Sequence, residues 1–258
     1  MTGLFGFLKR DHVVRSEPCV PEGTRVYAVG DIHGRADLLK SLFDLIRQDG
    51  EAYRECRKVL VFVGDYVDRG MESRKVIDLV LDSVPKGFEV ITLKGNHEAL
   101  MLDFLADRGA DELWLRNGGN ATLYSYGIQV NGNVTTEQGL DAVRHDFACA
   151  VPSRHVEFLN RLKMTHVEGD YLFVHAGIHP DLSMDEQSED ELLWIREEFL
   201  ASTADHGKVV VHGHSISRSW EPEIRANRIG IDTGAFVSGV LTCLVLQGIE
   251  RTFLQTGD

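Results

Sequence analysis

The sequence has 258 residues, of which 43% are hydrophobic, so it can build a substantial core in one large domain or two small ones. Its formal net charge of −13 argues against a surface whose main task is to bind nucleic acid. The four cysteines lie far apart and form no CxxC motif, which indicates reduced thiols rather than a disulfide framework. The sequence shows no signal peptide, and we expect a cytoplasmic protein without a membrane span.

The first half of the chain repeats one unit of strand, polar loop and helix three times. Apolar, β-branched runs at 25–29, 59–63 and 90–93 predict buried strands, and an apolar stripe at helical spacing follows each of them. Repeated units of this kind predict a parallel sheet with helices on its faces, whose ligand sites form at the carboxyl ends of the strands. We expect residues 1–24 to form a leader and residues 25–258 a single domain.

The middle of the chain departs from this pattern. Residues 108–163 predict a mainly helical insertion, interrupted at 117–120 and at 127–136 by glycine and asparagine. Within it, Ser153 is a candidate N-cap for one helix. We expect the insertion to pack near the functional site, because such segments often carry specificity.

The last third predicts a different alternation of elements. The residue pattern favours a hairpin, then an acidic helix, then several strands. The expected ranges are 165–168 and 171–174 for the hairpin, 185–198 for the helix, and 209–211, 229–231 and 241–246 for the strands.

Polar side chains that can bind metals or carry protons gather just after the predicted strands. Two aspartates and an arginine stand in one loop framed by glycines, 64–70, directly after a strand. Carboxylate, imidazole and amide ligands suit Mn²⁺, Fe²⁺ or Zn²⁺. A single such residue is most often structural, but this many at one sheet edge predict a functional site. The set comprises Asp31, His33, Asp65, Asp68, Arg69, Asn96, His97, His175, His212 and His214.

Five sequence blocks, GDIHG, GDYVDRG, GNHE, HAG and GHS, occur in this order between residues 30 and 215. Together they resemble the PPP family of metal-dependent phosphatases, in particular the bacterial and phage-type serine/threonine protein phosphatases. The resemblance implies an α/β fold, the four-layer αββα sandwich of the calcineurin-like metallophosphoesterases. It also implies hydrolysis by direct attack of a hydroxide that bridges two metal ions.

The resemblance implies two divalent metal ions, with Mn²⁺ favoured and Fe²⁺, Zn²⁺ or Mg²⁺ left open. Asp65 would bridge them. His212, which lies two residues before the last ligand on a predicted strand, is left out of the ligand set. The ligands that carry over are Asp31, His33 and Asp65 for the first ion and Asp65, Asn96, His175 and His214 for the second.

The same resemblance assigns the remaining groups of the site. His97 would be the general acid for the leaving alkoxide, and Asp68 would orient it. Arg69 and Arg196 would bind phosphate oxygens, together with Asn96, although Arg196 could instead pair with its acidic neighbours.

The chain also departs from the eukaryotic members of that family. It lacks their aromatic-cysteine segment near the C-terminus and has Gly-Ile-Asp-Thr-Gly-Ala at 230–235 instead, which favours a bacterial-type enzyme. The expected activity is hydrolysis of phosphomonoesters, above all phosphoserine and phosphothreonine in proteins. Three alternatives remain: a dinucleoside polyphosphate hydrolase acting on diadenosine tetraphosphate, an inactive metal-binding scaffold, and a nucleic-acid-processing enzyme. We expect a phosphorylated protein or small phosphoester as substrate, and neither nucleic acid nor an obligate partner.

Overall fold

The computed structural model describes residues 17–129 and 136–257, and its centre is a pair of five-stranded sheets. The first sheet has the order β10-β9-β1-β2-β3, in which β1, β2 and β3 are parallel and β9 and β10 are antiparallel. Its strands are β1 (Thr24–Val29), β2 (Arg57–Phe62), β3 (Phe88–Thr92), β9 (Thr242–Gln247) and β10 (Glu250–Gln255). The three predicted βα units therefore supply the parallel part of this sheet.

The second sheet has the order β4-β5-β6-β8-β7. The predicted hairpin pairs antiparallel, with Thr165 opposite Val174, and β5, β6 and β8 run parallel. Its strands are β4 (Thr165–Glu168), β5 (Tyr171–Val174), β6 (Val209–His212), β7 (Glu223–Ile224) and β8 (Arg228–Gly230).

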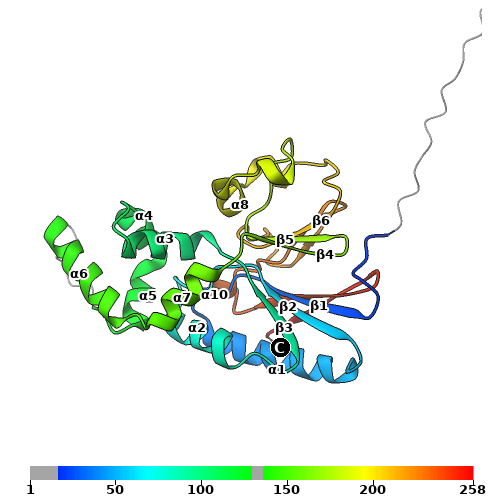
Figure 1. Cartoon of the computed structure of the whole chain (residues 1–258), viewed down its shortest axis with the longest axis horizontal. Coiled ribbons are helices and arrows are strands. Elements are labelled where there is room, and N and C mark those ends of the chain that lie inside the picture. Colours follow the sequence, from blue (N-terminus) through cyan, green and yellow to red (C-terminus); the bar gives the residue numbers. More distant parts are fainter. Residues whose placement is uncertain (1–16, 130–135, 258) are drawn as a thin grey trace, which may run out of the picture.

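The two sheets lie face to face, with helices outside each of them (Figure 1), which is the predicted four-layer αββα sandwich. Successive side chains of β1 point to opposite faces of the sheet and pack into two different layers. Val26 and Ala28 belong to the core between the sheets, whereas Tyr27 and Val29 belong to the core under the helices. Because both faces of the strand are buried, the run from Val26 to Val29 carries no charged residue and does not alternate with polar ones.

The helices of the three βα units cover the outer face of the first sheet. The buried side of α1 includes Leu39, Leu42, Phe43 and Ile46, which repeat at the spacing of one helical face. These helices are α1 (Ala36–Ala52), α2 (Ser73–Asp82) and α3 (Asn96–Leu105).

The described parts of the predicted insertion, residues 108–129 and 136–163, lie beside α2 and α3 at one end of the molecule (Figure 1). Most of the predicted interruption at 127–136 lies outside the described residues. The predicted interruption at 117–120 is confirmed as a kink, because Gly118 takes a non-helical φ of 105° there. The prediction for Ser153 is wrong: Pro152 is the N-cap and Ser153 is the first helical residue. The helical elements are α4 (Asp111–Trp114), η1 (Leu115–Gly119), α5 (Asn120–Ser125), α6 (Glu137–Ala150) and α7 (Ser153–Arg161).

The outer layer of the second sheet differs from the single helix predicted at 185–198. The chain breaks at Ile195, whose ψ of 141° is extended, and Arg196 precedes a separate short helix. The break lets Ile195 and Phe199 both pack into the small core behind this sheet. The observed elements are η3 (Met184–Glu186), α8 (Glu189–Trp194) and α9 (Glu197–Leu200), and α10 (Ala235–Ser238) precedes β9.

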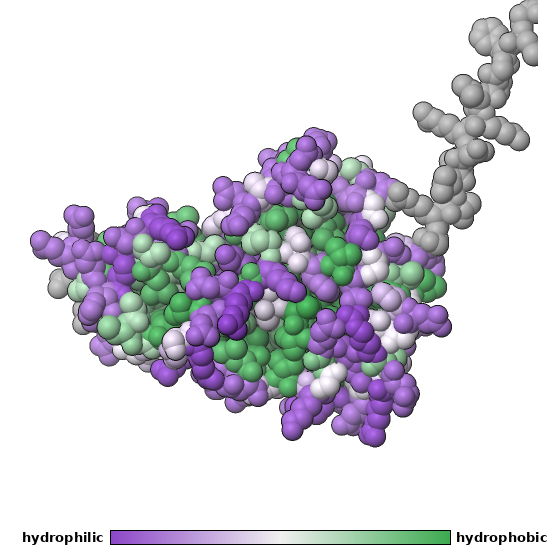
Figure 2. All heavy atoms as spheres, in the orientation of Figure 1, coloured by the Kyte–Doolittle hydropathy of each residue, from purple (hydrophilic) through white to green (hydrophobic). Residues whose placement is uncertain are grey.

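Residues 1–16 of the predicted leader lie outside the described residues, but its end packs firmly. Val20 is buried in the core between the sheets, and its N–H donates to the carbonyl of Gly248. On the face shown in Figure 2, hydrophilic side chains are spread widely, and hydrophobic ones lie between them. Among the described helices, none combines the length and the apolar character needed to cross a membrane.

Phe173 fills the centre of the core between the sheets and is fully buried. We predict that Phe173→Ala lowers the free energy of unfolding by about 3–5 kcal/mol, because it leaves a cavity that the two sheets cannot close. Urea denaturation followed by circular dichroism measures the change. Val167→Ala, on the neighbouring strand with a 47% exposed side chain, is the control and should change stability by less than ~0.5 kcal/mol. Equal losses in the two variants would contradict this assignment of the core.

Candidate active site

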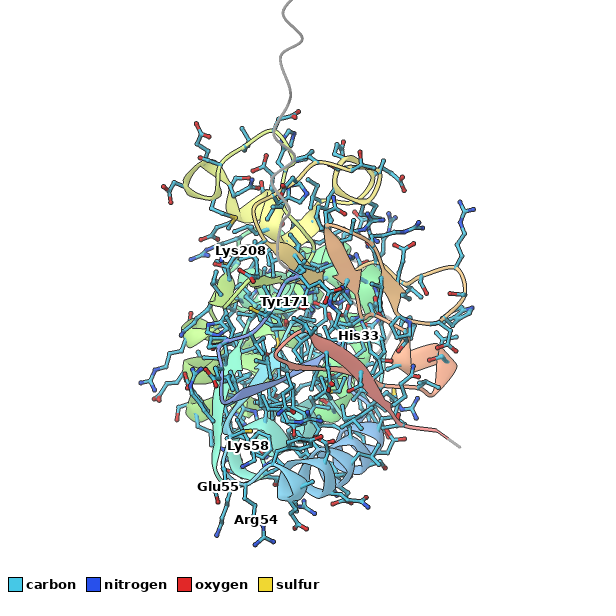
Figure 3. The ribbon with its side chains drawn as sticks, turned by 90° about the vertical axis from the view of Figure 1, so that its right-hand side faces the viewer. His33, Arg54, Glu55, Lys58, Tyr171 and Lys208 are labelled. Carbon is cyan, nitrogen blue, oxygen red and sulfur yellow. The ribbon has the colours of Figure 1, made fainter. Side chains whose placement is uncertain are left out.

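The structure brings the predicted site residues together at the carboxyl ends of strands from both sheets. Loops after β1 and β2 contribute from the first sheet, and loops after β5 and β6 contribute from the second. Figure 3 shows His33 at mid-height between the upper and lower layers, whereas Arg54 and Glu55 lie far below it at the foot of the helical layer. The site therefore lies where the two sheets meet.

Asp65 stands at the centre of this arrangement. Its Oδ2 lies 3.4 Å from His33 Nε2, and its Oδ1 lies 3.4 Å from His175 Nε2. The two oxygens of one carboxylate thus face two different groups of potential metal ligands. Within the described residues these groups are His33 with Asp65 and His97, and Asp65 with His175 and His214. This is the geometry expected of a carboxylate that bridges two cations.

The second group converges on the side chain of Asn96. Its Oδ1 lies 2.9 Å from His175 Nε2 and 3.0 Å from His214 Nδ1. The other ring nitrogen of His175, Nδ1, lies 2.9 Å from the carbonyl oxygen of Val63 and donates to it. This bond leaves the lone pair of Nε2 facing the group, which is how proteins orient histidine ligands.

The first group differs in one respect from the predicted ligand set. His33 is oriented like His175, since its Nδ1 lies 2.9 Å from the carbonyl oxygen of Val67. However, the third member of the tight group is His97, which was predicted as an acid, rather than Asp31. The Oδ2 of Asp31 accepts the N–H of His214 at 2.9 Å, while its Oδ1 is buried without a partner. Asp31 therefore has one oxygen available for a ligand in the site.

The protonation states of Asp65 and of the histidines around it favour the binding of a cation. Burial works against the charge of Asp65, but the nearby imidazoles of His175, His97 and His33 outweigh it and lower the pKa of the carboxyl group. Burial, with help from His175, lowers the pKa of His214 to about 2, so this imidazole is neutral. Its Nε2 is also buried without a partner. Neutral imidazoles around a buried carboxylate are a donor set that fits divalent metal ions.

Asp31 has a further acidic neighbour that the sequence interpretation did not single out. Burial, and then the charges of Asp232 and Asp65, raise the pKa of Asp31 well above its usual value. Asp232 is itself 3% exposed, and its Oδ2 has no partner among the described residues. It belongs to the segment 230–235 that distinguishes this chain from the eukaryotic phosphatases, which was the only sequence signal for it.

The backbone is strained where these side chains are presented. Within the described part of the chain, seven residues other than glycine have positive φ, and five of them are predicted site residues. Such conformations concentrate at functional sites because the surrounding structure must hold them in place. The five are His33 (46°), Asp65 (54°), Asp68 (72°), Arg69 (66°) and His214 (62°).

Glu98 holds the strained loop after β2. Its Oε2 accepts the N–H groups of Asp65 and Gly95, both at 2.9 Å, and its Oε1 accepts those of Tyr66 at 2.8 Å and Val67 at 3.2 Å. Four backbone donors satisfy this fully buried carboxylate. Glu98 stands in the GNHE block, but sequence reasoning assigned it no role, because its partners are backbone groups of another segment.

His97 and Asp68 form the predicted pair. His97 Nδ1 lies 2.7 Å from Asp68 Oδ2, and both side chains are buried. Burial alone would lower the pKa of His97, but the carboxylates of Asp65 and Asp68 outweigh it and raise that pKa. The Asp68 carboxylate also accepts hydrogen bonds from Trp114 and Thr122 of the insertion, two residues that sequence reasoning missed.

The two arginines lie on opposite sides of the site. The guanidinium group of Arg69 lies 2.9 Å from His33 Nε2 and 3.2 Å from His97 Nε2, and it stacks on Phe236 at 4.7 Å. Arg196 donates to the carbonyl oxygen of His214 at 3.3 Å, so it points toward the second group of ligands rather than to its glutamate neighbours. Both side chains are placed where they could reach a phosphate.

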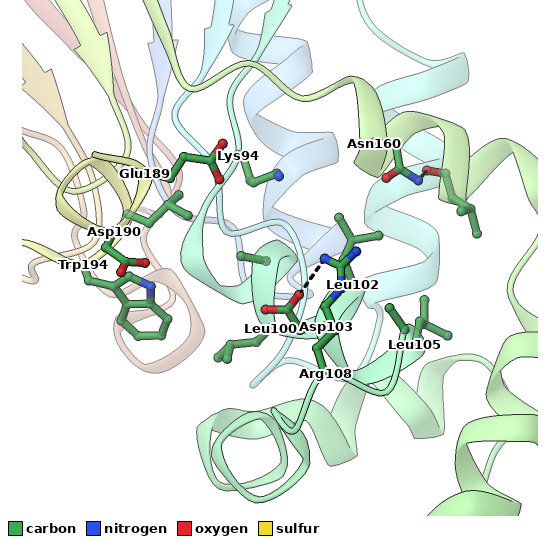
Figure 4. A pocket seen from close by; sticks show the side chains of 14 residues that line it. Lys94, Leu100, Leu102, Asp103, Leu105, Arg108, Asn160, Glu189, Asp190 and Trp194 are labelled. Atoms are coloured by element: carbon green, nitrogen blue, oxygen red, sulfur yellow. Dashed lines mark hydrogen bonds and ion pairs between the residues drawn. The ribbon is translucent and has the colours of Figure 1, made fainter. Parts of the chain in front are cut away.

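A cavity of about 420 Å³ opens next to the second group (Figure 4). Glu189, Asp190 and Trp194 of α8 line one side, and Lys94 faces them. The Trp194 ring also packs edge-on against the His214 ring, with centroids 6.2 Å apart, which places the cavity beside the site. This cavity could hold a part of a substrate that extends away from the phosphate.

Two groups of ligands that share one carboxylate, with an acid–base pair and arginines beside them, define a metal-dependent phosphoester-cleaving site. Residues 24–233 match the calcineurin-like phosphoesterase family, and the chain belongs to that family. It is a metallophosphoesterase and hence a hydrolase.

Relatives of the chain carry different activities in their names. It is 29% identical over 229 residues to serine/threonine-protein phosphatase 2 of Salmonella typhimurium, covering 84% of this chain and 90% of that one. It is 30% identical over 161 residues to a symmetrical bis(5'-nucleosyl)-tetraphosphatase of Nitrosospira multiformis, covering 62% of this chain and 46% of that one. This chain thus spans less than half the length of the second relative.

Solved structures support the fold. A crystal structure provisionally identified as a diadenosine tetraphosphatase superposes with a TM-score of 0.61 at 22% identity. The superposition covers 94% of this chain and all of the other. At this identity the likeness establishes the architecture alone.

The bridging position of Asp65 yields a prediction about metal content. We expect Asp65→Asn to lower the bound metal from about two ions per chain to below about one. The Asp65 carboxylate offers one charged oxygen to each ligand group, whereas the asparagine amide has a single, neutral oxygen. His97→Asn should keep the wild-type content, since the predicted ligands of the first ion are Asp31, His33 and Asp65 and do not include His97. Elemental analysis after gel filtration in Mn²⁺ measures this, with the exposed Asp185→Asn as control. Unchanged metal in Asp65→Asn would contradict the bridge, and loss in His97→Asn would make His97 a ligand.

Proposed function

We propose that the protein hydrolyses phosphomonoesters, with phosphoserine and phosphothreonine in proteins as its substrates. The observation that carries this proposal is the His97–Asp68 pair, 2.7 Å apart, directly beside the Asp65 carboxylate that joins the two ligand groups. A positioned acid is needed to expel an alkoxide, which is a poor leaving group, and serine and threonine esters release alkoxides.

The predicted ligands Asp31, His33 and Asp65, and Asp65, Asn96, His175 and His214, would hold two divalent cations. When bound, two such ions polarise a phosphoryl group and lower the pKa of a water between them towards neutrality. We propose Mn²⁺ for both positions, because the donor set consists of nitrogen and oxygen atoms without a thiolate.

The side chains of the site would divide the remaining work. Arg69 and Arg196 would grip the phosphate oxygens, and Asn96 would orient the group between them. To do so, Arg69 must leave His33 Nε2, which it contacts at 2.9 Å, and His97 Nε2, which it contacts at 3.2 Å. His97 would donate the proton on Nε2 to the leaving oxygen, while Asp68 holds the opposite nitrogen and stabilises the imidazolium.

The surroundings of the site favour a protein substrate over a dinucleoside polyphosphate. Glu189 and Asp190 are exposed at the cavity beside the site and have no ion-pair partner among the described residues. The chain as a whole carries a net charge of −13. A tetraphosphate brings several negative charges past these carboxylates, whereas a phosphopeptide brings one phosphate and can bring basic side chains.

The alternative substrate is equally supported by the relatives, several of which are named as bis(5'-nucleosyl)-tetraphosphatases. The matching protein of Nitrosospira multiformis is named as a nucleosyl tetraphosphatase, and Trp194 beside the site offers an aromatic face on which a base could stack. Both substrates would use the same ligands and acid. We place the activity in the cytoplasm, where the four free cysteines would stay reduced.

A direct comparison of substrates tests this choice. With Mn²⁺ present, we expect kcat/KM for a phosphoserine peptide with basic flanking residues to exceed that for diadenosine tetraphosphate by about tenfold or more, a difference that needs only ~1.4 kcal/mol of differential binding. The doubly neutralised variant Glu189→Gln/Asp190→Asn should narrow the gap, because it removes the repulsion. Faster cleavage of the dinucleotide by the wild type would overturn the protein-phosphatase proposal.

The acid has its own test. We expect His97→Asn to reduce kcat for the phosphoserine peptide by roughly 10²–10⁴-fold, the usual worth of a positioned acid, while metal stays bound. Steady-state kinetics on metal-loaded protein measures this. His145→Asn, an exposed histidine of the insertion, is the matched control. Wild-type turnover in His97→Asn would exclude the proposed mechanism.

A further inference from the structure

One short segment of the insertion reaches directly into the acid–base pair. Residues 114–122 run from the end of α4 through the kink at Gly118 into α5. Along this stretch, Trp114 and Thr122 contact the side chain of Asp68, and Gly118 contacts the main chain of Arg69. Three contacts from nine residues converge on the loop that also carries Asp65. None of these contacts could be expected from the sequence blocks.

Three hydrogen bonds from this segment and from His97 hold the Asp68 carboxylate. Thr122 Oγ1 donates to Oδ1 at 2.6 Å, and Trp114 Nε1 donates to Oδ2 at 3.0 Å. His97 Nδ1 shares Oδ2 at 2.7 Å. Asp68 is fully buried, so water cannot replace a missing donor, and each bond constrains where the carboxylate lies.

Trp114 is held too rigidly to be a chance neighbour. Its ring is fully buried between Phe104 and Phe147, with centroids 4.6 and 5.6 Å away. This packing fixes the ring, so its indole N–H is held in the direction of Asp68. Thr122 is equally buried, and its hydroxyl also accepts the Asp68 N–H at 2.9 Å. The side chain and the backbone of Asp68 are thus held by the same hydroxyl group.

The turn between these two residues is shaped for the same purpose. The carbonyl oxygen of Gly118 accepts the N–H of Arg69 at 3.3 Å. Gly118 has φ 105°, and a Cβ atom there would stand 2.7 Å from Arg69 N. Only glycine allows this approach, so the kink between α4 and α5 depends on Gly118.

We propose that Trp114 and Thr122 are positioning residues for the acid step. They hold the Asp68 carboxylate so that it fixes the His97 ring with Nε2–H directed at the leaving oxygen. In that step water adds to phosphorus, the bond from phosphorus to the leaving oxygen breaks, and the Nε2 proton moves to that oxygen. The proton that the attacking water releases when its oxygen bonds to phosphorus then restores the proton on His97. The inference rests on the proposed function, since it assumes that His97 is the acid.

Two substrates with different leaving groups can distinguish a positioning role from a merely structural one. A phosphoserine peptide releases an alkoxide and needs the proton, whereas p-nitrophenyl phosphate releases a stable phenolate and needs it little. Damage to the fold or to metal binding slows both substrates alike. Damage to the acid slows the peptide selectively.

The variants remove one donor at a time. Thr122→Val keeps the shape of the side chain and removes its hydroxyl group. Trp114→Phe keeps an aromatic ring and removes the indole N–H. Thr122→Ser is the conservative variant, because it keeps a hydroxyl group at this position. We expect the first two to lower kcat for the phosphopeptide by roughly 10–10²-fold, and for p-nitrophenyl phosphate by less than about threefold, with little change in KM. Thr122→Ser should recover most of the lost peptide turnover. Tyr124→Ala, at an exposed position of the same helix, is the control.

His97→Asn run beside them separates this inference from the proposed function. If His97→Asn slows the peptide selectively while Thr122→Val and Trp114→Phe slow both substrates equally or neither, the positioning role is overturned and the acid stands. If His97→Asn itself shows no selectivity, the acid assignment fails and the positioning role fails with it. Metal content and melting temperature are measured for every variant. Should Trp114→Phe fail to fold, the Thr122 pair decides.

Discussion

Asp65 carries a charge at a position that is only 1% exposed, and a buried carboxylate is tolerated only where its neighbours compensate it. Here three histidines supply that compensation, and Glu98 ties down the backbone that presents Asp65. The carboxylate in turn divides its two oxygens between two ligand groups. The architecture follows from this requirement, because only the meeting edge of two stacked sheets brings ligands to both oxygens.

The loops at that edge are short, strained and closely packed. Gly95 illustrates the crowding, since a Cβ atom there would stand 2.1 Å from Asp65 Oδ1. The buried sheets on either side hold the ends of each loop in fixed positions, and this stabilises the strained backbone conformations. Donors aimed in advance at the place where charge develops are the largest source of catalytic power in sites of this kind, so rigidity here serves chemistry.

Function is divided between the sheets and the insertion. The sheet edges carry the ligands, whereas the support for the His97–Asp68 pair comes from Trp114 and Thr122, far outside the βα units. A segment of this kind could be mistaken for a specificity element alone. Its contacts with Asp68 also make it a support for the acid that we propose. We propose that the substrate is selected at the cavity lined by Trp194 of α8.

The sequence by itself determined the βα repeats, the sheet edge and the list of candidate ligands, because apolar periodicity and the polar blocks at strand ends are local signals. It could not show that the chain breaks at Ile195 or that Pro152 caps α7, since packing overrides helix propensity at both places. Nor could it reveal the roles of Glu98, Trp114, Thr122 and Asp232. Glu98, Trp114 and Thr122 bond to groups that only the folded chain brings close, and Asp232 acts on Asp31 from a distant part of the sequence. Tertiary neighbours of this kind leave no periodic trace in the sequence.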